Sequence, residues 1–397
     1  MKTNEIIEKY DQFVMHTYAP AVALTKGKGS KVFAPEGMNY LDFTSGISVH
    51  NVGHCHPKVV EAIQQQAATL SHCSNLFFNE QQALLAERLS RLSLNGKCFF
   101  CNSGAEANEA MVKLARLWGH DQGKYEVITF YNSFHGRTLA MLSATAQEKV
   151  QKGFDPLPVG FAYAEFNNLE SVKEAINEKT VAVMLEAVQA EGGIHPATPE
   201  FMEGLRALCD EKGLLLLCDE VQCGLGRTGK LWGWQHSGIR PDAFTLAKSI
   251  ADGVPMGVLV ANPKLSDVFQ PGNHASTFGG NPLASAAALA VLDVIEQEGL
   301  VQQSEKMGKL FKDGLALFVE KYEQVLEVRG TGLLVGLVVE GRAKDVVDAC
   351  RDMWLLCCVA GEHVVRFLPP LNITESILEE ALEMIGDALN GLFGEDD

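Results

Sequence analysis

Leu214-Leu-Leu-Leu-Cys-Asp219 and Ala243-Phe-Thr-Leu-Ala-Lys248 are two apolar runs that each end on a charged side chain. A continuous apolar run of this length is typical of a strand that is buried on both faces of a sheet. Burial of an Asp or a Lys is unfavourable unless another group compensates the charge. Asp219 and Lys248 therefore need a chemical reason to stand at the ends of two buried strands.

Pyridoxal phosphate (PLP) gives both side chains such a reason. This cofactor needs a carboxylate beside its protonated ring nitrogen and an amine that forms a Schiff base with its aldehyde. Burial lowers the pKa of a lysine and so presents the neutral, nucleophilic amine. A helix cap or salt bridge at Asp219 and a solvated Lys248 are the alternatives, and the choice depends on the rest of the chain.

Composition limits the possible partners. The 397 residues have room for one large α/β domain and a smaller one. With 33 Lys and Arg against 50 Asp and Glu, the net charge is −17, which argues against nucleic acid or an anionic membrane as a partner. The N-terminus is too charged for a signal peptide and no apolar stretch is long enough to span a membrane, so we expect a cytoplasmic protein.

Two cysteine- and histidine-containing segments resemble metal sites. Cys98 and Cys101 are spaced as C-x-x-C, but the aromatic residues between them indicate a strand, on which the two thiols point to opposite faces. His54-Cys-His56 is followed by Pro57 and a helical pattern, which favours a helix start. We expect no metal, and reduced thiols at the ten irregularly spaced cysteines.

Strand-like and helical segments alternate between residues 51 and 282, with helices expected at 104–118, 168–177 and 199–212. This alternation predicts an α/β fold whose large domain has a mostly parallel sheet flanked by helices. The expected strands lie near Lys97–Cys101, Tyr125–Phe130, Val181–Leu185, Leu214–Cys218, Ala243–Ala247 and Met256–Ala261.

A smaller α/β domain is expected at residues 283–397. It begins with a long helix whose apolar stripe includes Ala286, Ala290 and Val294. Strands are expected at 325–329, 333–339 and 364–368. Residues 1–50 are predicted to form an irregular arm with short strands that packs with this domain, which leaves 51–282 as the large domain.

Three segments carry residues suited to binding. Asn102-Ser-Gly-Ala-Glu106 links a strand to a helix start, where free N–H groups favour a phosphate, although Ser103 is equally compatible with an ordinary helix cap. In Phe134-His-Gly-Arg137 the ring can stack on a flat cofactor and the guanidinium can hold a carboxylate. The loop from His274 to Pro282 is polar enough to reach a phosphate, but most such loops are connectors.

Gly224-Leu-Gly-Arg-Thr-Gly-Lys230 suggests a different function because its spacing is that of a phosphate-binding P-loop. Leu231 stands where the P-loop has its magnesium-binding Ser or Thr, and the residues that follow make a poor helix start. A nucleotide triphosphatase is therefore disfavoured.

Together these segments resemble the class III, fold-type I PLP aminotransferases along essentially the whole chain, most of all the members that act on N-acetylornithine. The stretches that carry the resemblance are Phe100–Glu109, Ser133–Leu139, Gly192–Glu200, Cys218–Gly224, Ser276–Pro282 and Val365–Leu371.

The resemblance implies a role for each matching residue. Lys248 would form the Schiff base and move the proton, and Asp219 would pair with the ring nitrogen. Arg137 and Ser276 would hold the carboxylate end of the substrate. Arg366 would bind the α-carboxylate of glutamate, and Glu191 would neutralise Arg366 when the other substrate is bound. The remaining implied cofactor contacts are Ser103, Gly104, Ala105, Phe134, Glu220, Val221, Gln222 and, across the interface of a homodimer, Thr277.

The implied reaction moves the terminal amine of N2-acetylornithine to 2-oxoglutarate, giving N-acetylglutamate 5-semialdehyde and glutamate, as in arginine biosynthesis. Ile47 stands where ornithine aminotransferases have a tyrosine, and Phe134 and Phe278 fit the acetylornithine group better than the 4-aminobutyrate group. Succinylornithine, succinyldiaminopimelate, ornithine and 4-aminobutyrate stay open as amine donors. A non-catalytic PLP-fold binding protein is a further alternative.

Four residues depart from the family pattern: Ala187, Ala190, Ser249 and Ala275 stand where proline or glycine is usual. At a position where the family backbone has a positive φ, an added Cβ is expected to destabilise by about 1 kcal/mol or more. Because Ala190 precedes Glu191, the carboxylate switch is the function that this expectation puts most in doubt.

Overall fold

The computed structural model describes residues 1–394 and contains one seven-stranded sheet. Its spatial order is β4 (Cys98–Cys101), β12 (Gly257–Ala261), β11 (Ala243–Leu246), β10 (Leu215–Asp219), β7 (Thr180–Glu186), β5 (Glu126–Phe130) and β6 (Phe161–Ala164). The strands from β11 to β6 pair in parallel, whereas β12 is antiparallel to β11 and to β4. The predicted mostly parallel sheet is confirmed, and β6 is a strand that was not predicted.

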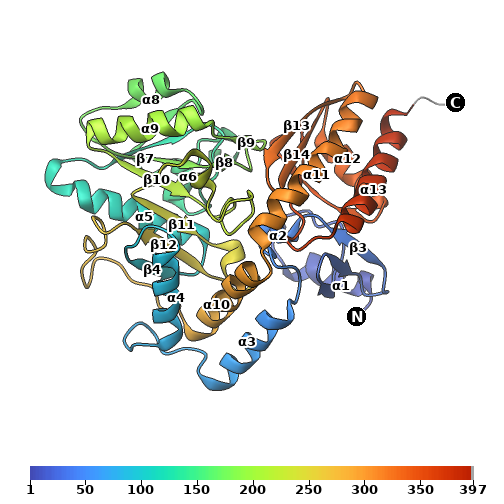
Figure 1. Cartoon of the computed structure of the whole chain (residues 1–397), viewed down its shortest axis with the longest axis horizontal. Helices are drawn as coiled ribbons and strands as arrows, with labels where there is room; N and C mark the ends of the chain where they lie inside the picture. Colours follow the sequence, from blue (N-terminus) through green and yellow to red (C-terminus); the bar gives the residue numbers. More distant parts are fainter. Residues whose placement is uncertain (395–397) are drawn as a thin grey trace.

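The apolar run of β10 is continuous because both of its faces are covered. Leu215 and Leu217 belong to the apolar cluster that contains the helix α5 (Gly104–Gly119), whereas Leu216 and Cys218 belong to the cluster that contains α9 (Pro199–Lys212). Figure 1 shows strands of this sheet between the two helices. Alternate residues of one strand thus fill two different cores, as the sequence pattern predicted.

Local signals set the ends of α9. The Oγ1 of Thr198 accepts the N–H of Phe201 at 3.2 Å, Pro199 occupies the first turn, and Gly213 ends the helix at φ +64°. Together with α5 and α8 (Leu169–Ala175), α9 confirms the three predicted helices to within two residues.

The long helix α10 (Pro282–Gln297) packs within a group of helices. The predicted face of Ala286, Ala290 and Val294 is buried, and α10 packs against α3 (Pro57–Thr69) and α4 (Glu80–Arg91). α3 begins directly after His54-Cys-His56, which confirms the predicted helix start, and the Nε2 of His54 lies 2.7 Å from the Oδ2 of Asp42.

The C-terminal part forms an antiparallel sheet in the order β13 (Val325–Thr331), β14 (Leu334–Val339), β17 (Val364–Phe367) and β16 (Cys358–Ala360). The helices of this part are α11 (Leu300–Lys321), α12 (Ala343–Asp352) and α13 (Glu375–Phe393). All three predicted strands of this region are present. β17 carries Arg366 towards the large sheet.

The N-terminal strands β1 (Lys26–Lys28), β2 (Lys31–Phe33) and β3 (Asn39–Asp42) form a separate sheet that β15 (Leu355–Leu356) completes. Figure 1 shows these blue strands beside the red and orange C-terminal elements. The short strands were predicted, but α1 (Thr3–Phe13) was not. None of its residues is buried, although Ile6, Tyr10 and Phe13 recur at helical spacing.

A left-handed turn at Ser45–Ser48 follows the N-terminal strands and precedes α3. Ser45, Gly46, Ile47 and Ser48 all have φ between +46° and +63°. A β-branched residue such as Ile47 rarely adopts this conformation, and backbone strain of this kind is concentrated at functional sites.

Candidate active site

A cavity of about 420 Å³ opens at the carboxyl ends of β10 and β11. The ends of three neighbouring strands are aligned there, since Asp219 is in register with Glu186 on one side and with Thr245 on the other. Ligands of α/β sheets bind beyond the carboxyl ends of the strands. The cavity brings together nine of the predicted site residues: Ser103, Gly104, Ala105, Phe134, Arg137, Asp219, Val221, Gln222 and Lys248.

Asp219 is 3% exposed, and three donors fix its carboxylate. The Nδ2 of Asn108 donates to Oδ2 at 2.7 Å, the Nδ1 of His135 lies 2.8 Å from the same oxygen, and the N–H of Val221 donates to Oδ1 at 3.0 Å. Because a carboxylate only accepts, Nδ1 of His135 carries the hydrogen. These three contacts fix the position of the Asp219 carboxylate at the cavity.

Asn108 and His135 are site residues that the sequence did not reveal. The Oγ1 of Thr245 donates to the Oδ1 of Asn108 at 2.7 Å, which extends the chain of hydrogen bonds behind Asp219. Nε2 of His135 is buried and has no hydrogen-bond partner within the described part of the chain. The available signal was the position of His135 inside the segment Phe134–Arg137.

Lys248 follows β11 with φ +46°, a strained conformation for a residue with a side chain. Burial lowers the pKa of its amine, and the negative charge of Glu191 opposes this shift only in part. The neutral form of the amine therefore becomes accessible at lower pH than in an exposed lysine.

The start of α5 offers a cradle for an anion. Oγ of Ser103 accepts the N–H of Glu106 at 3.2 Å. Ser103 is therefore a helix cap, which was the alternative to a phosphate contact in the sequence analysis. The N–H groups of Gly104 and Ala105 have no acceptor among residues 1–394. A Cβ on Gly104 would lie 2.8 Å from a methyl group of Val221, so only glycine leaves this approach open.

Phe134 and Arg137 also line the cavity. The guanidinium carbon of Arg137 is 5.5 Å from the centre of the Phe134 ring. Arg137 is exposed and forms no ion pair with another described residue. Its donors are thus available for an anionic ligand.

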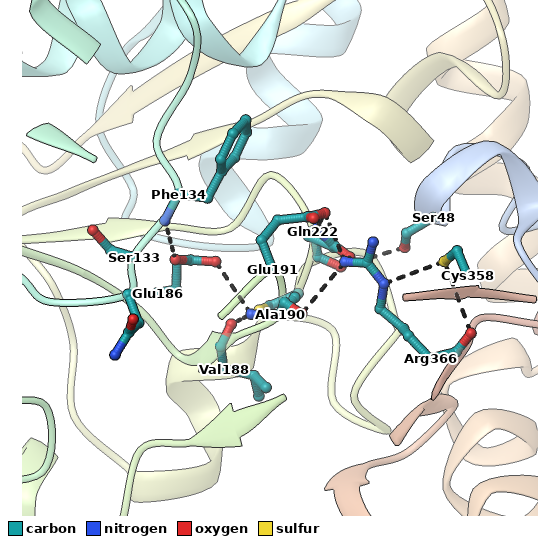
Figure 2. A network of polar contacts seen from close by, with 12 residues as sticks. Ser48, Ser133, Phe134, Glu186, Val188, Ala190, Glu191, Gln222, Cys358 and Arg366 are labelled. Atoms are coloured by element: carbon teal, nitrogen blue, oxygen red, sulfur yellow. Dashed lines mark hydrogen bonds and ion pairs between the residues drawn. The ribbon is translucent and has the colours of Figure 1, made fainter. Parts of the chain in front are cut away.

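Arg366, Glu191 and Gln222 form a second polar group beside the cavity (Figure 2). Nη1 of Arg366 donates to Glu191 at 2.6 Å and to Oε1 of Gln222 at 2.9 Å. Burial alone would raise the pKa of Glu191, but the charge and the hydrogen bond of Arg366, together with Lys248 and Gln222, outweigh it and keep this pKa below its ordinary value. The pair is therefore ionised and closed in this conformation.

Five predicted residues lie outside the cavity lining: Arg366 and Glu191, which form the ion pair described above, and Glu220, Ser276 and Thr277. Glu220 is buried, and its carboxylate accepts the N–H groups of Gly233 and Trp234 at 2.7 and 3.0 Å. Its side chain holds that loop in place of the predicted cofactor contact. The hydroxyl of Ser276 accepts the N–H of Gly279, and Thr277 is exposed.

Comparison with known proteins places these features in a family. The profile described as "Aminotransferase class-III" matches residues 14–389. The chain is a class III aminotransferase. Among curated proteins, it is 48% identical over 384 residues to the acetylornithine aminotransferase of Caldanaerobacter subterraneus subsp. tengcongensis, covering 96% of this chain and 98% of the relative. The acetylornithine aminotransferase of Methanocaldococcus jannaschii is 46% identical, with 94% of each chain covered.

Solved structures are similar over the same length. The ornithine aminotransferase of Toxoplasma gondii has a TM-score of 0.95 and 33% identity, covering 98% of this aminotransferase and 95% of that chain. The N-acetylornithine aminotransferase of Stenotrophomonas maltophilia has a TM-score of 0.83 and 35% identity, covering 95% and 98%. The similarity therefore includes the N-terminal strands, the seven-stranded sheet, the four-stranded C-terminal sheet and the C-terminal helices.

The segment of this aminotransferase that resembles a P-loop has a structural role. Arg227 at its centre is fully buried and donates to Ser48 Oγ at 3.0 Å, to Asn51 Oδ1 at 2.6 Å, and to the carbonyls of Leu333 and Pro369. The central side chain of the segment thus ties the left-handed turn to the C-terminal part of the fold. This use supports the rejection of a nucleotide site.

The four departures from the family pattern introduce no backbone strain. Ala187, Ala190, Ser249 and Ala275 all have negative φ. The destabilisation that was expected at positive φ therefore does not arise, and Glu191, which follows Ala190, forms its ion pair with Arg366. In the described part of the aminotransferase, no helix combines the length and apolarity needed to cross a membrane.

Proposed function

We propose that this aminotransferase carries PLP and transfers the terminal amino group of N2-acetylornithine to 2-oxoglutarate, giving N-acetylglutamate 5-semialdehyde and glutamate. The observation that carries the proposal is the single cavity that faces both Asp219 and Lys248. The identity of 48% to an acetylornithine aminotransferase over nearly the whole of both chains supports the amine donor.

The residues of the cavity fit the cofactor. Asp219 would face the ring nitrogen, the free N–H groups of Gly104 and Ala105 would receive the phosphate, and Gln222 would hydrogen-bond the ring oxygen. When bound, PLP supplies an electron sink for the bond that breaks at the substrate carbon. The orphaned ring nitrogen of His135 and the open approach at Gly104 are the features of this structure that support the fit.

Lys248 would hold the cofactor and then act as the base and acid that moves a proton at the substrate carbon. Its lowered pKa makes the neutral amine available, and its place at the end of β11 keeps it within the cavity. Phe134 would lie against the ring. Arg137, with Ser276, would hold the carboxylate end of the acylated substrate.

The Arg366–Glu191 pair would let one site accept two amino donors. With glutamate bound, its α-carboxylate takes the place of Glu191 on Arg366. With the acylated amine bound, Glu191 returns and neutralises the buried guanidinium, which is 1% exposed and would otherwise lack a counter-charge.

We further propose a homodimer in which Thr277 reaches the phosphate in the partner's site. Leu76, Phe77 and Phe78 are 83%, 69% and 109% exposed, and Phe278 is 59% exposed. An apolar group of this size at the surface is typical of a protein contact. The Nδ2 of Asn75 donates to the carbonyl of Ser276 at 2.8 Å, which joins this group to the loop that carries Thr277.

Ornithine is the second candidate donor because solved ornithine aminotransferases share this fold with a TM-score of 0.95. A panel of amines, each supplied with 2-oxoglutarate, separates the candidates by the glutamate formed. We expect kcat/KM to be highest for N-acetylornithine, and the visible spectrum of the purified protein to change when this amine is added. A protein that is colourless and unresponsive to every amine would overturn the proposed function.

A further inference from the structure

Glu186 is a cavity residue to which sequence reasoning gave no role. It ends β7 in register with Asp219, and its side chain is 4% exposed. Figure 2 shows its carboxylate between two separate segments of the chain. Oε1 accepts the N–H of Phe134 at 2.9 Å, and Oε2 accepts the N–H of Ala190 at 3.4 Å.

The two segments joined by Glu186 carry different parts of the site. Phe134 lines the cavity on the side of Asp219. Ala190 precedes Glu191, and its carbonyl accepts a hydrogen bond from Nη1 of Arg366 at 3.4 Å. One carboxylate therefore connects the wall that faces the cofactor with the Arg366–Glu191 pair.

The charge of Glu186 has no cationic partner within hydrogen-bond reach among residues 1–394. The titratable groups that face it are His135, Asp219, Lys248 and Cys223. Burial raises its pKa to about 7, with Asp219 adding to this effect and His135 opposing it. The proton on Glu186 is thus exchanged in the neutral pH range.

Protonation changes what Glu186 can hold. The ionised carboxylate offers lone pairs on both oxygens and accepts both N–H groups. The neutral acid has a hydroxyl in place of one acceptor, so one of the two N–H groups loses its strong, charge-assisted bond. The connection between the two segments is complete only in the ionised form.

We propose that Glu186 is a positioning residue that clamps the Phe134 segment to the Ala190–Glu191 turn and thereby aligns the two halves of the site. The inference rests on the proposed function for its effect on catalysis, but not for the clamp itself. Transamination should accordingly rise as the pH increases through about 7, where the clamp forms.

Glu220 provides a matched control for the substitution. It is also buried, its pKa is also raised to about 7 by burial, and its carboxylate also accepts two backbone N–H groups. Its partners, Gly233 and Trp234, lie outside the cavity lining. Glu186→Gln and Glu220→Gln therefore remove the same kind of interaction at two places.

Hydrogen–deuterium exchange of the purified full-length protein tests the clamp without any substrate. In Glu186→Gln, peptides that contain Phe134 and Ala190 should exchange about ten-fold faster, whereas those that contain Gly233 and Trp234 should keep wild-type protection. Glu220→Gln should show the opposite pattern. Unchanged exchange at both Phe134 and Ala190 in Glu186→Gln would overturn the clamp.

The single-turnover rate with glutamate tests the catalytic consequence. We expect Glu186→Gln to be about ten-fold slower above pH 7 and to lose the inflection near pH 7 that the wild type and Glu220→Gln retain. Glu186→Asp should keep a titration but remain slow, since its shorter side chain cannot reach both N–H groups. A wild-type pH profile in Glu186→Gln, or an equal loss in Glu220→Gln, would refute the role.

The two proposals fail in different ways. A wild-type protein that reacts with glutamate but not with N-acetylornithine contradicts the proposed donor and leaves the clamp standing. Wild-type exchange at Phe134 and Ala190 in Glu186→Gln contradicts the clamp and leaves the donor standing.

Discussion

The surroundings of Asp219 and the loop around Thr277 are both expected to hold the same cofactor, yet they differ in burial and in hydrogen bonding. Asp219 is buried at a strand end, and three donors from different segments of the chain fix its carboxylate. Thr277 is exposed and stands next to Phe278, which is 59% exposed.

The difference is the one that the proposed homodimer would produce, with one part of the site formed within a chain and another part supplied by the partner subunit. The three hydrogen bonds that fix Asp219 form without a ligand, because they also hold the strands and loops around the sheet together. Thr277 is exposed, so its proposed contribution depends on another surface. The proposed dimer supplies that surface, and the predictions below test each region in turn.

Removal of the Lys248 amine should have the largest effect. Lys248→Ala is expected to lower turnover by about 10³-fold or more, because the proton at the substrate carbon loses its acid and base. Steady-state glutamate formation measures this change. Lys230→Ala is the control, since Lys230 is exposed on the segment that resembles a P-loop and should leave turnover unchanged. A similar loss in both variants would contradict the assignment.

Removal of the carboxylate charge should have the next largest effect. Asp219→Asn is expected to reduce turnover by about 10²-fold, because the ring nitrogen would lose the anion that keeps it protonated. It should also lower the free energy of unfolding by about 1–3 kcal/mol, because a donor of Asn108 or His135 loses its acceptor.

Asp242→Asn separates these two effects. Asp242 pairs with Arg206 at 2.9 Å and lies outside the cavity lining. This variant should lose stability in urea denaturation but keep the wild-type visible spectrum and turnover. Equal loss of turnover in both variants would mean that Asp219 acts only on stability.

Substitution of Thr277 in the exposed loop should have a moderate effect, and this effect should appear in the site of the partner subunit. Thr277→Ala is expected to weaken PLP binding about ten-fold through the loss of one hydrogen bond to a charged group. Mixed dimers of Thr277→Ala and Lys248→Ala should contain one intact site if Thr277 serves the partner subunit. Recovery of tight PLP binding and turnover on mixing tests this, and the absence of recovery would place Thr277 in the site of its own chain.

The smallest expected effect concerns stability and pH. Burial lowers the pKa of Lys248, so the unfolded chain binds more protons than the folded chain between that lowered pKa and the ordinary value. Stability of the cofactor-free wild type therefore rises with pH in this window. Lys248→Met should be more stable by about 1 kcal/mol at neutral pH, and its advantage should shrink as the pH rises. Thermal unfolding at several pH values measures this, and an advantage that grows with pH would contradict the sign.

The fold was largely predictable because burial leaves a direct trace in the sequence. Leu214–Cys218 is apolar at every position and Ala243–Ala247 at every position except Thr245, a pattern typical of strands that are covered on both faces. β6 was missed because this strand has only the four residues Phe161–Ala164, two of which are alanines. α1 was not predicted although Ile6, Tyr10 and Phe13 recur at helical spacing, and the helix buries no residue.

The site was predictable where a residue is unusual in its own segment, and not where its role depends on distant partners. Asp219 and Lys248 are charged residues at the ends of apolar runs. Asn108 lies 111 residues and His135 lies 84 residues from the carboxylate that they hold, and Glu186 lies 52 residues from Phe134. Such pairings come from the strand order, which no local pattern contains.

Reductive trapping tests the central claim most directly. The purified protein is treated with borohydride, digested and mapped by mass spectrometry for a pyridoxyl group on lysine. The account predicts one modified peptide that contains Lys248 in the wild type, and weak or no incorporation in Asp219→Asn. A label on another lysine, or wild-type protein without any label, would contradict the claim that the amine of Lys248 and the carboxylate of Asp219 hold the same cofactor.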